Sequence, residues 1–304
     1  MKHSIEQNKS LLLSKKGKVF GPMWMKKIIN KNRSVLDKKE KNNFNNKLNT
    51  YTKSIKTKLI KLRGSLKINP KFSVIVPAYN EEDYILQLLE SISNQKNIGK
   101  VEVIIVVNNS NDKTAKFSKK CGVKVIDYQL DKKYPPVAYA RQKGLVESKG
   151  EIILSTDADA LVGENWIEEL TKPIIEDENV TVSIGEINFY DGKSLPLINP
   201  IMKLIRKYEI KFFPKNGIVG FANIAFRKKD IMKVGGWPQL SAEEDTRLVR
   251  KLISIGNPRF TNNKTTIWVS GRRWMLPVTK IIEEKFKRGG DHFIDKDGNL
   301  KIVR

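Results

Sequence analysis

Two aspartates separated by one residue, Asp157 and Asp159, follow the apolar run 152–154 after Ser155 and Thr156. The run is typical of a buried strand, and in open α/β sheets ligands bind just beyond the carboxyl ends of the strands. Neighbouring carboxylates repel each other unless a cation or hydrogen-bond donors stabilise them. Hard divalent ions such as Mg²⁺ or Mn²⁺ take oxygen ligands and often share them with substrate phosphates. The spacing therefore indicates a metal–nucleotide site, and a solvated turn that caps the next helix is the alternative.

A second acidic group, Glu243, Glu244 and Asp245, lies in the first turn of a predicted helix over 242–255. Acids at this end of a helix suit its dipole, so capping explains them without any chemistry. A chemical role for these three acids would require a fold that places them close to Asp157 and Asp159.

The elements that would position these groups begin abruptly at Lys71, where strand and helix patterns start to alternate. Strands are expected at 72–76, 101–107, 123–126, 151–155, 180–186, 217–226 and 264–269. One helix is expected to begin at Asp83, and others to span 137–148, 166–176, 199–213 and 242–255. A further helix, capped by a turn at 108–112, is expected to end near Lys120. Pro77 is expected to end the first strand, because proline cannot donate to a ladder. Such alternation with short links predicts an α/β fold with a mostly parallel sheet and right-handed crossovers.

The net charge of +24 is concentrated before this region. Residues 1–70 hold 19 Lys and Arg against 3 Asp and Glu. Leu48, Tyr51, Ile55, Leu59 and Leu62 recur there at helical spacing, with lysines between them. A basic amphipathic helix of this kind can lie on an anionic membrane surface. Packing on the main domain, disorder, or a compositional bias toward Lys and Asn are the other interpretations.

Several classes of protein are disfavoured by composition. No run approaches the 18 apolar residues of a membrane-spanning helix, and the start of the chain is too weak for a secretory signal. The single Cys121 forms no internal disulfide and fits a reducing compartment. With only His3 and His292 beside it, a zinc site is not expected. No nucleic-acid-binding module is recognisable, so nucleic acid is not expected as a partner.

Four motifs occur in order along residues 71–271 and together resemble a nucleotide-sugar glycosyltransferase of family 2. They are the strand and loop at 72–82 (FSVIVPAYNEE), the D-x-D triplet at 157–159, the segment at 220–227 (GFANIAFR), and Gly235-Gly236-Trp237 followed by Glu244-Asp245. The resemblance implies a GT-A fold, with a Rossmann-like, mostly parallel central sheet and helices on both faces. It divides the chain into a basic, partly helical extension at 1–70, a GT-A domain at 71–271 and a basic and polar tail at 272–304.

The resemblance also assigns residues to the donor. The nucleotide pocket would be lined by Pro77, Ala78, Tyr79 and Glu81, with Arg141 as a basic residue near the donor. An ordinary surface arginine is the alternative for Arg141. Asp159 would be the direct ligand of Mg²⁺ or Mn²⁺, which neutralises the leaving diphosphate. Asp157 would meet the donor's ribose or sugar, or share the metal.

For the acceptor side, the resemblance makes Asp245 the general base that removes a hydroxyl proton. Glu244 would orient the acceptor or cap the helix. Direct attack through an oxocarbenium-like transition state would invert the anomeric centre. These expectations describe an inverting enzyme of hexosyltransferase type (EC 2.4).

The chain departs from the family pattern at the base of the nucleotide. Val107 occupies the position where relatives commonly place an aspartate that reaches uracil, and valine cannot accept a hydrogen bond. Asn108 would substitute if the loop shifted by one residue. UDP-linked and GDP-linked donors therefore both stay open. Gly271, Arg272, Arg273 and Trp274 partly match a synthase motif but lack its glutamine, which disfavours a processive polymer synthase.

Two other classes compete with a glycosyltransferase: a sugar nucleotidyltransferase, and a non-enzymatic basic binding protein. The first would be expected to carry a glycine-rich loop after the first strand, which is absent from residues 77–80. The second explains residues 1–70 but not the ordered acidic motifs. The acceptor, a glycan or a lipid-linked molecule of the cell envelope, is not specified by the residues. We expect a cytoplasmic enzyme, peripheral at the inner membrane face if residues 1–70 bind lipid.

Overall fold

A computed structural model of the chain describes residues 38–64, 69–131, 136–190, 223–240, 244–261, 263–271, 291–294 and 300–303. Its strands are β1 (Phe72–Ala78), β2 (Val101–Asn108), β3 (Lys124–Tyr128), β4 (Ile152–Ser155), β5 (Val180–Ile184), β6 (Ile187–Phe189), β7 (Ile224–Arg227), β8 (Asn257–Phe260), β9 (Ile267–Val269), β10 (Asp291–Ile294) and β11 (Leu300–Val303). Its helices are α3 (Lys38–Arg63), α4 (Ile85–Ser93), α5 (Thr114–Lys120), α6 (Pro136–Glu147), α7 (Trp166–Glu176), α9 (Lys228–Lys233), α10 (Glu244–Ile253) and the short 3₁₀ helix η2 (Asn263–Thr265).

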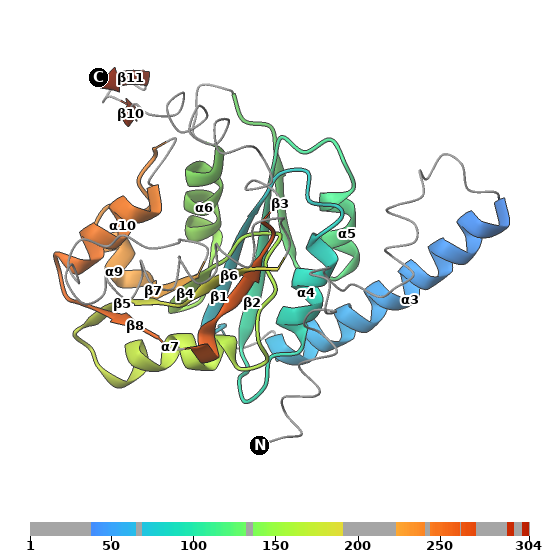
Figure 1. The fold of residues 1–304 in the computed structure, drawn as a ribbon, viewed down its shortest axis with the longest axis horizontal. Helices are drawn as coiled ribbons and strands as arrows, with labels where there is room; N and C mark the ends of the chain where they lie inside the picture. Colours follow the sequence, from blue (N-terminus) through green and yellow to red (C-terminus); the bar gives the residue numbers. More distant parts are fainter. Residues whose placement is uncertain are drawn as a thin grey trace.

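Seven strands form the central sheet in the order β3-β2-β1-β4-β7-β5-β8 (Figure 1). Only β7 runs against its neighbours β4 and β5, and the other pairs are parallel. Strands β6 and β9 form a parallel pair, and β10 and β11 an antiparallel one. The predicted mostly parallel α/β sheet is therefore confirmed.

Helices cover both faces of this sheet, and each face has its own buried apolar cluster. On one face β1 and β2 pack with α4, α5 and α7, through residues such as Val74, Ile105 and Trp166. On the other face the strands pack with α6, α9 and α10, through residues such as Ile75 and Leu248. Because side chains alternate along a strand, Val74 and Ile75 face opposite clusters. The helices on both faces agree with the expected architecture.

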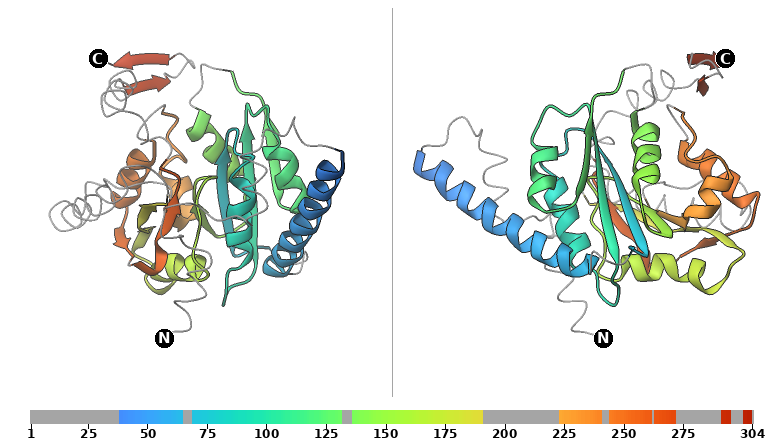
Figure 2. Two further views of the ribbon diagram at one scale, coloured as in Figure 1. Left: turned by 45° about the vertical axis from the view of Figure 1, so that its right-hand side comes forward. Right: turned by 180° about the vertical axis from the view of Figure 1, so that it is seen from behind.

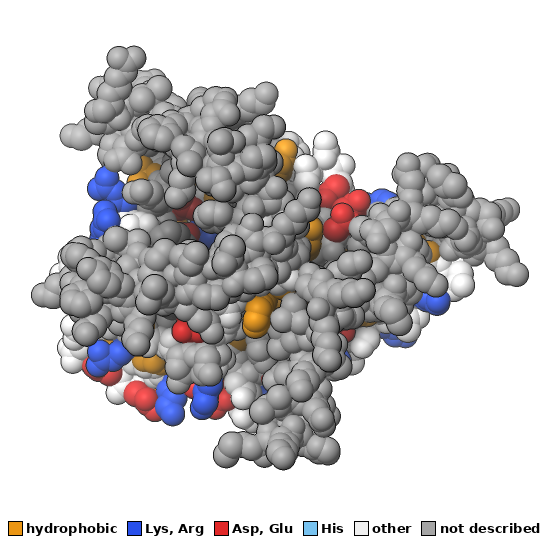
Figure 3. Space-filling model, in the orientation of Figure 1, with side chains coloured by type: hydrophobic (Ala, Val, Ile, Leu, Met, Phe, Trp, Pro, Cys, Tyr) orange, Lys and Arg blue, Asp and Glu red, His pale blue; other side chains and the backbone are white. Residues whose placement is uncertain are grey.

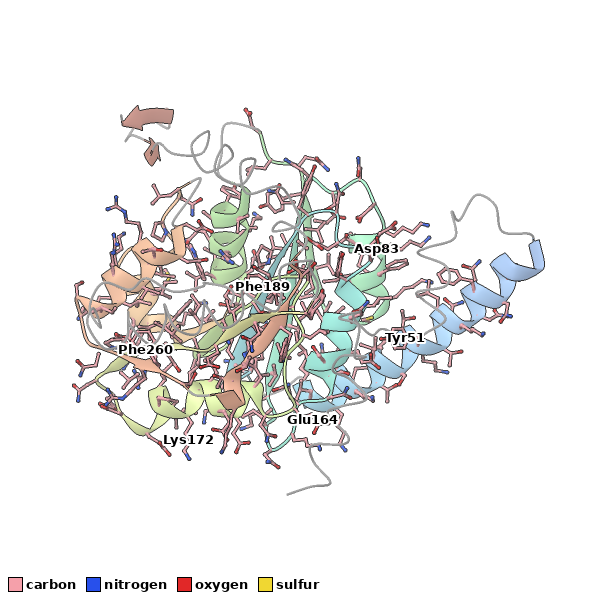
Figure 4. The ribbon with its side chains drawn as sticks, viewed as in Figure 1. Tyr51, Asp83, Glu164, Lys172, Phe189 and Phe260 are labelled. Atoms are coloured by element: carbon pink, nitrogen blue, oxygen red, sulfur yellow. The ribbon has the colours of Figure 1, made fainter. Side chains whose placement is uncertain are left out.

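Helix α3 adds a further layer outside α4 and α5 (Figures 1 and 2). The predicted stripe Leu48, Ile55, Leu59 and Leu62 is buried and belongs to the same apolar cluster as β1 and β2. Tyr51 lies between α3 and α4 and donates a 2.6 Å hydrogen bond to Glu90 (Figure 4). Of the interpretations left open by the sequence, packing on the main domain is the one that this helix adopts.

Up to residue 176, the predicted strand and helix limits differ from the observed ones by at most two residues. Pro77 does not end β1, which continues to Ala78. The Thr156 N–H donates to the Ile75 carbonyl, so Ile75 and Pro77 both face β4. Strand β4 ends at Ser155, opposite Ile75, so no ladder bond is required from the N–H that Pro77 lacks.

The later predictions are less accurate. The strand expected over 264–269 is η2 followed by β9. Strands β6, β8, β10 and β11 and helix α9 were not predicted. The helix expected over 199–213 lies outside the described residues, and so does most of the strand expected over 217–226. The same is true of Arg272, Arg273 and Trp274. None of the helices that the structure describes combines the length and apolar character needed to cross a bilayer.

Candidate active site

The candidate site lies at the edge of the sheet where β1, β2 and β4 end. These strands are parallel and paired in register, with Ala78 opposite Val107 and Ile75 opposite Ser155. The segments that follow them therefore emerge on the same edge. They carry Tyr79 to Glu82, Asn109 to Thr114, and the Asp157–Asp159 pair.

Arg141 on α6 joins Asp157 to Glu244 and Asp245, whereas Glu243 lies outside the described residues. Its Nη2 donates a 2.9 Å hydrogen bond to Asp157, and its Nη1 donates to Glu244 at 2.9 Å and to Asp245 at 2.8 Å. The Arg141 side chain is 3% exposed, Asp245 5% and Glu244 14%, whereas Asp157 is 43% exposed. Arg141 is thus not a surface arginine. It is a buried cation shared by three carboxylates, one of which is open to a ligand.

Burial has opposite consequences for the two central charges. It opposes the charge of Arg141, but the carboxylates of Asp245, Asp157 and Glu244 raise the pKa of Arg141 above its usual value. Burial raises the pKa of Asp245 to about 8, even though Arg141 lowers it. The charges of Glu244 and Asp157 raise it further, and the Trp237 hydrogen bond lowers it. A carboxyl group that titrates near neutral pH is suited to accepting and releasing protons.

The helix that carries Arg141 is held against the sheet by close packing. A Cβ on Gly144 would lie 2.4 Å from Ile75 Cγ2 and 3.2 Å from Val106 Cγ2. Only glycine allows α6 to approach β1 and β2 this closely. One turn earlier on the same helix, Arg141 is thereby directed at the edge where Asp157 lies.

Two loops at this edge are joined side by side. Five hydrogen bonds link them: Asn80 N–H to Ser110 Oγ (3.0 Å), Glu81 N–H to Thr114 Oγ1 (2.8 Å), Glu82 N–H to Asp112 Oδ2 (2.9 Å), Asn111 N–H to Asn80 Oδ1 (3.0 Å) and Lys113 N–H to Glu82 Oε2 (3.2 Å). Asn80 and Asn109 both adopt φ near +52°, a left-handed conformation that asparagine tolerates. Glu81 is buried, whereas Tyr79 is 62% exposed. The two hydrogen-bonded loops thus form one surface, from which the Tyr79 ring is exposed.

At the end of β2, the side chain on the same face as Arg141 is that of Asn108 and not that of Val107. Val107 is fully buried in the apolar cluster of the α4 face, so its side chain is directed away from the α6 side. Asn108 is the last residue of β2 and is 3% exposed. Alternation along the strand directs Asn108 to the α6 face, the side of Val106 and Arg141. No shift of the loop is needed to bring Asn108 to this edge.

Asp159 is the residue expected to bind the metal ion directly. It is partly exposed, and its backbone carbonyl accepts a 2.9 Å hydrogen bond from Tyr190 Oη. Among the described residues no three Asp, Glu, His or Cys side chains form a cluster that could hold a metal. Mg²⁺ usually takes one or two carboxylates and completes its shell with waters and substrate phosphates. The oxygen donors of Asp159 and Asp157 fit that pattern, since the remaining ligands would come with a nucleotide.

Sequence reasoning missed the structural role of Asn223, which lies within the motif at 220–227. Its Oδ1 accepts a 2.8 Å hydrogen bond from the Trp166 indole, and its Nδ2 donates to the Glu186 and Thr265 carbonyls. It is fully buried and joins α7, the turn after β5, and η2. A single asparagine in a loop carries no periodic signal that could have predicted this.

A cavity of about 620 Å³ lies at the opposite edge of the sheet, where β1 and β4 begin. Lys71, Lys149, Arg227 and Lys228 are among its lining residues, with Ile175. Two of these cations are already engaged: Arg227 donates to backbone carbonyls including that of Val180, and Lys228 donates to the Ser148 carbonyl. This cavity is not the candidate active site, because the carboxylates that share Arg141 lie at the other edge of the sheet.

Solved structures establish the class of the fold. The S. aureus TarS fragment 1–349 in complex with UDP-GlcNAc matches with a TM-score of 0.50 and 22% identity, over 66% of this chain and 58% of that one. The mannosyltransferase PcManGT from Pyrobaculum calidifontis, in complex with GDP-Man and Mn²⁺, matches with a TM-score of 0.51 and 20% identity, over 73% and 64% of the two chains. The fold is therefore of the GT-A glycosyltransferase type.

Sequence comparison assigns the family. The model of glycosyl transferase family 2 matches residues 73–235, and the chain belongs to this family. The probable glycosyltransferase YdaM of Bacillus subtilis is 28% identical over 209 residues, which are 64% of this chain and 50% of that protein. The chain therefore spans about half the length of this curated relative.

Proposed function

We propose that the chain is a metal-dependent, inverting glycosyltransferase that moves a sugar from a nucleoside-diphosphate sugar to an acceptor hydroxyl or phosphate. The observation that carries this proposal is Arg141, which joins Asp157 of the donor motif to Asp245 of the acceptor motif. A single buried cation thereby sets the separation between two carboxylates with different tasks. Family membership supports the same reaction class.

On the donor side, Asp159 with Asp157 would hold a Mg²⁺ or Mn²⁺ ion, which supplies neutralising charge for the departing diphosphate. The PcManGT complex, which contains Mn²⁺ and GDP-Man, supports a divalent ion in this fold. Glu81 and Asn108 are the polar groups available to the ribose and base. The exposed ring of Tyr79 offers a surface on which a base can stack.

In the transfer step, Asp245 accepts the proton of the acceptor hydroxyl as the oxygen attacks the anomeric carbon. The bond from that carbon to the diphosphate oxygen breaks, and its electron pair leaves with the nucleoside diphosphate. Attack from the face opposite the leaving group inverts the anomeric configuration. Glu244 lies beside Asp245 on α10 and is available to orient the acceptor.

For the acceptor, we propose a glycan or lipid-linked molecule at an anionic membrane surface. Its support is the exposed side of α3, which carries Lys47, Lys53, Lys56, Lys58 and Lys61, whereas residues 42–64 contain no Asp or Glu. On α7, by contrast, exposed Lys172 pairs with Glu176. Acidic and basic side chains lie together along the lower edge of the face in Figure 3. Because the apolar stripe of α3 is buried against the domain, attraction to lipid phosphates would be purely electrostatic.

A panel of nucleotide sugars, assayed with Mg²⁺, with Mn²⁺ and with a chelator, tests the reaction class. Metal-dependent release of UDP or GDP is the expected result and also identifies the donor. Release of pyrophosphate from a sugar phosphate and a nucleoside triphosphate would instead identify a sugar nucleotidyltransferase. If neither product forms with any donor, the enzymatic proposal is wrong and a binding role remains.

A further inference from the structure

The Asp245 carboxylate is held through both of its oxygens by donors from two different elements. Arg141 Nη1 on α6 donates to Oδ2 at 2.8 Å, and the Trp237 indole Nε1 donates to Oδ1 at 3.2 Å. Holding both oxygens prevents rotation of the carboxylate about its Cβ–Cγ bond. The direction of the lone pairs that remain is therefore set by Arg141 and Trp237 together.

Trp237 is itself held rigidly on three sides. Its backbone N–H donates a 2.7 Å hydrogen bond to Gln142 Oε1, and the Arg141 guanidinium lies 5.5 Å from its ring centre. The Phe226 ring meets it edge-on at 5.6 Å. Gly236, with φ of +77°, turns the chain into this position and packs on Gln142. The side chain is 2% exposed, so the indole has no room to move.

We propose that Trp237 is a positioning residue for transfer: its indole N–H fixes the orientation in which Asp245 meets the acceptor hydroxyl. The inference rests on the proposed function, because it concerns the base of that reaction. The indole N–H donates to Asp245, the proposed base, so we expect Trp237 to act on the chemical step rather than on donor binding.

The test is Trp237→Phe, which keeps an aromatic ring against Phe226 and Arg141 but removes the N–H. We expect kcat to fall about tenfold, the effect of one hydrogen bond to a charged group, with the donor KM unchanged. The acid limb of the pH profile should move to higher pH, since the lost bond stabilised the ionised carboxylate. The charged groups that face Asp245, namely Arg141, Glu244 and Asp157, are retained in this variant.

Trp166→Phe is the matched control. The Trp166 indole is also fully buried and donates a 2.8 Å hydrogen bond, but to Asn223 and not to Asp245. A comparable loss of stability with unchanged kcat and pH profile is expected for this variant. Equal kcat losses in the two variants would overturn the proposal, as would a wild-type kcat and pH profile in Trp237→Phe.

A second readout does not depend on activity or on the folding of Trp237→Phe. In protein labelled with ¹⁵N-tryptophan, the Trp237 indole resonance should shift in Asp245→Asn and move with pH as Asp245 titrates in the wild type. The Trp166 resonance should do neither. If the indole responds but the wild type transfers no sugar, the proposed function fails while the contact stands. An indole insensitive to both changes overturns the inference itself.

Discussion

Arg141 and Asp245 form a 2.8 Å ion pair across 104 positions of sequence, in a site where both side chains are about 95% buried or more. The pair joins α6, which follows the third strand of the chain, to α10, near the end of the described domain. Asp157 and Glu244 share the same guanidinium. The donor and acceptor motifs are therefore joined through one buried cation.

Replacement of Arg141 by alanine should destabilise the fold and abolish transfer. Removing one partner of a buried ion pair leaves an uncompensated charge and costs ~3–5 kcal/mol in the free energy of unfolding. Urea unfolding measures this cost. Arg141→Lys keeps the charge but loses the fork that spans the carboxylates, so it should recover part of the stability and little of the activity. Full activity in Arg141→Lys would contradict the role of the fork.

Asp245→Asn should lower kcat by about 10²–10⁴-fold, the usual contribution of a positioned general base. Donor binding should persist, because Asp245 lies on the acceptor side of Arg141. Titration calorimetry with the nucleotide measures binding, and initial rates measure kcat. Asp230→Asn, on α9 outside the site, is the control and should transfer sugar normally. Turnover near the wild-type level in Asp245→Asn would rule out Asp245 as the base.

Many residues of this site could be predicted from the sequence, but the contacts between them could not. Asp157 and Asp245 were found because each lies in a local motif, and α7 was predicted from its apolar periodicity with the correct limits. The contacts of Arg141 could not be predicted, because two of its three carboxylate partners lie more than 100 positions away in sequence and a helix pattern does not show which face meets which strand. Trp237 belonged to a recognised motif, yet its bond to Asp245 depends on a glycine turn and on Gln142.

The contribution of Asp245 to the stability of the protein should fall as pH rises from about 4 to about 8. The folded-state pKa of Asp245 is raised to about 8, whereas an unfolded aspartate titrates near ~3.9. In this window the folded chain keeps a proton that the unfolded chain releases, so the free energy of unfolding decreases with increasing pH. Other groups titrate here as well, so the quantity to measure is the difference between wild type and Asp245→Asn. A difference that does not change with pH would contradict the raised pKa.

Reversing the charge of three exposed lysines on α3 should weaken binding to anionic vesicles. Lys47, Lys53 and Lys61 are solvent-exposed, so their replacement by glutamate leaves the buried stripe intact. Vesicles of phosphatidylglycerol and phosphatidylcholine should bind the wild type at low salt and release it as the salt concentration rises. Reversal at Lys172 on α7, labelled in Figure 4, is the control and should have little effect. Equal binding by all variants would exclude α3 as the contact.

Cys121 provides a probe of whether α3 stays docked when a membrane is present. Burial raises the pKa of the Cys121 thiol to about 12, so in the native protein it should react very slowly with thiol reagents, which attack the thiolate. The thiol belongs to the same buried cluster as Ile55 of α3. Ile55→Ala removes buried methyl groups at a cost of ~2–5 kcal/mol and should loosen the helix and speed labelling.

Anionic vesicles should leave the labelling of wild-type Cys121 unchanged if only the lysines of α3 meet the lipid. If the apolar stripe instead left the domain to enter the bilayer, Cys121 would lose its cover and react as fast as in Ile55→Ala or faster. Labelling followed by mass spectrometry, with and without vesicles, separates these two modes of attachment. Acceleration by anionic but not neutral vesicles would show that the packing of α3 seen here is one of two states.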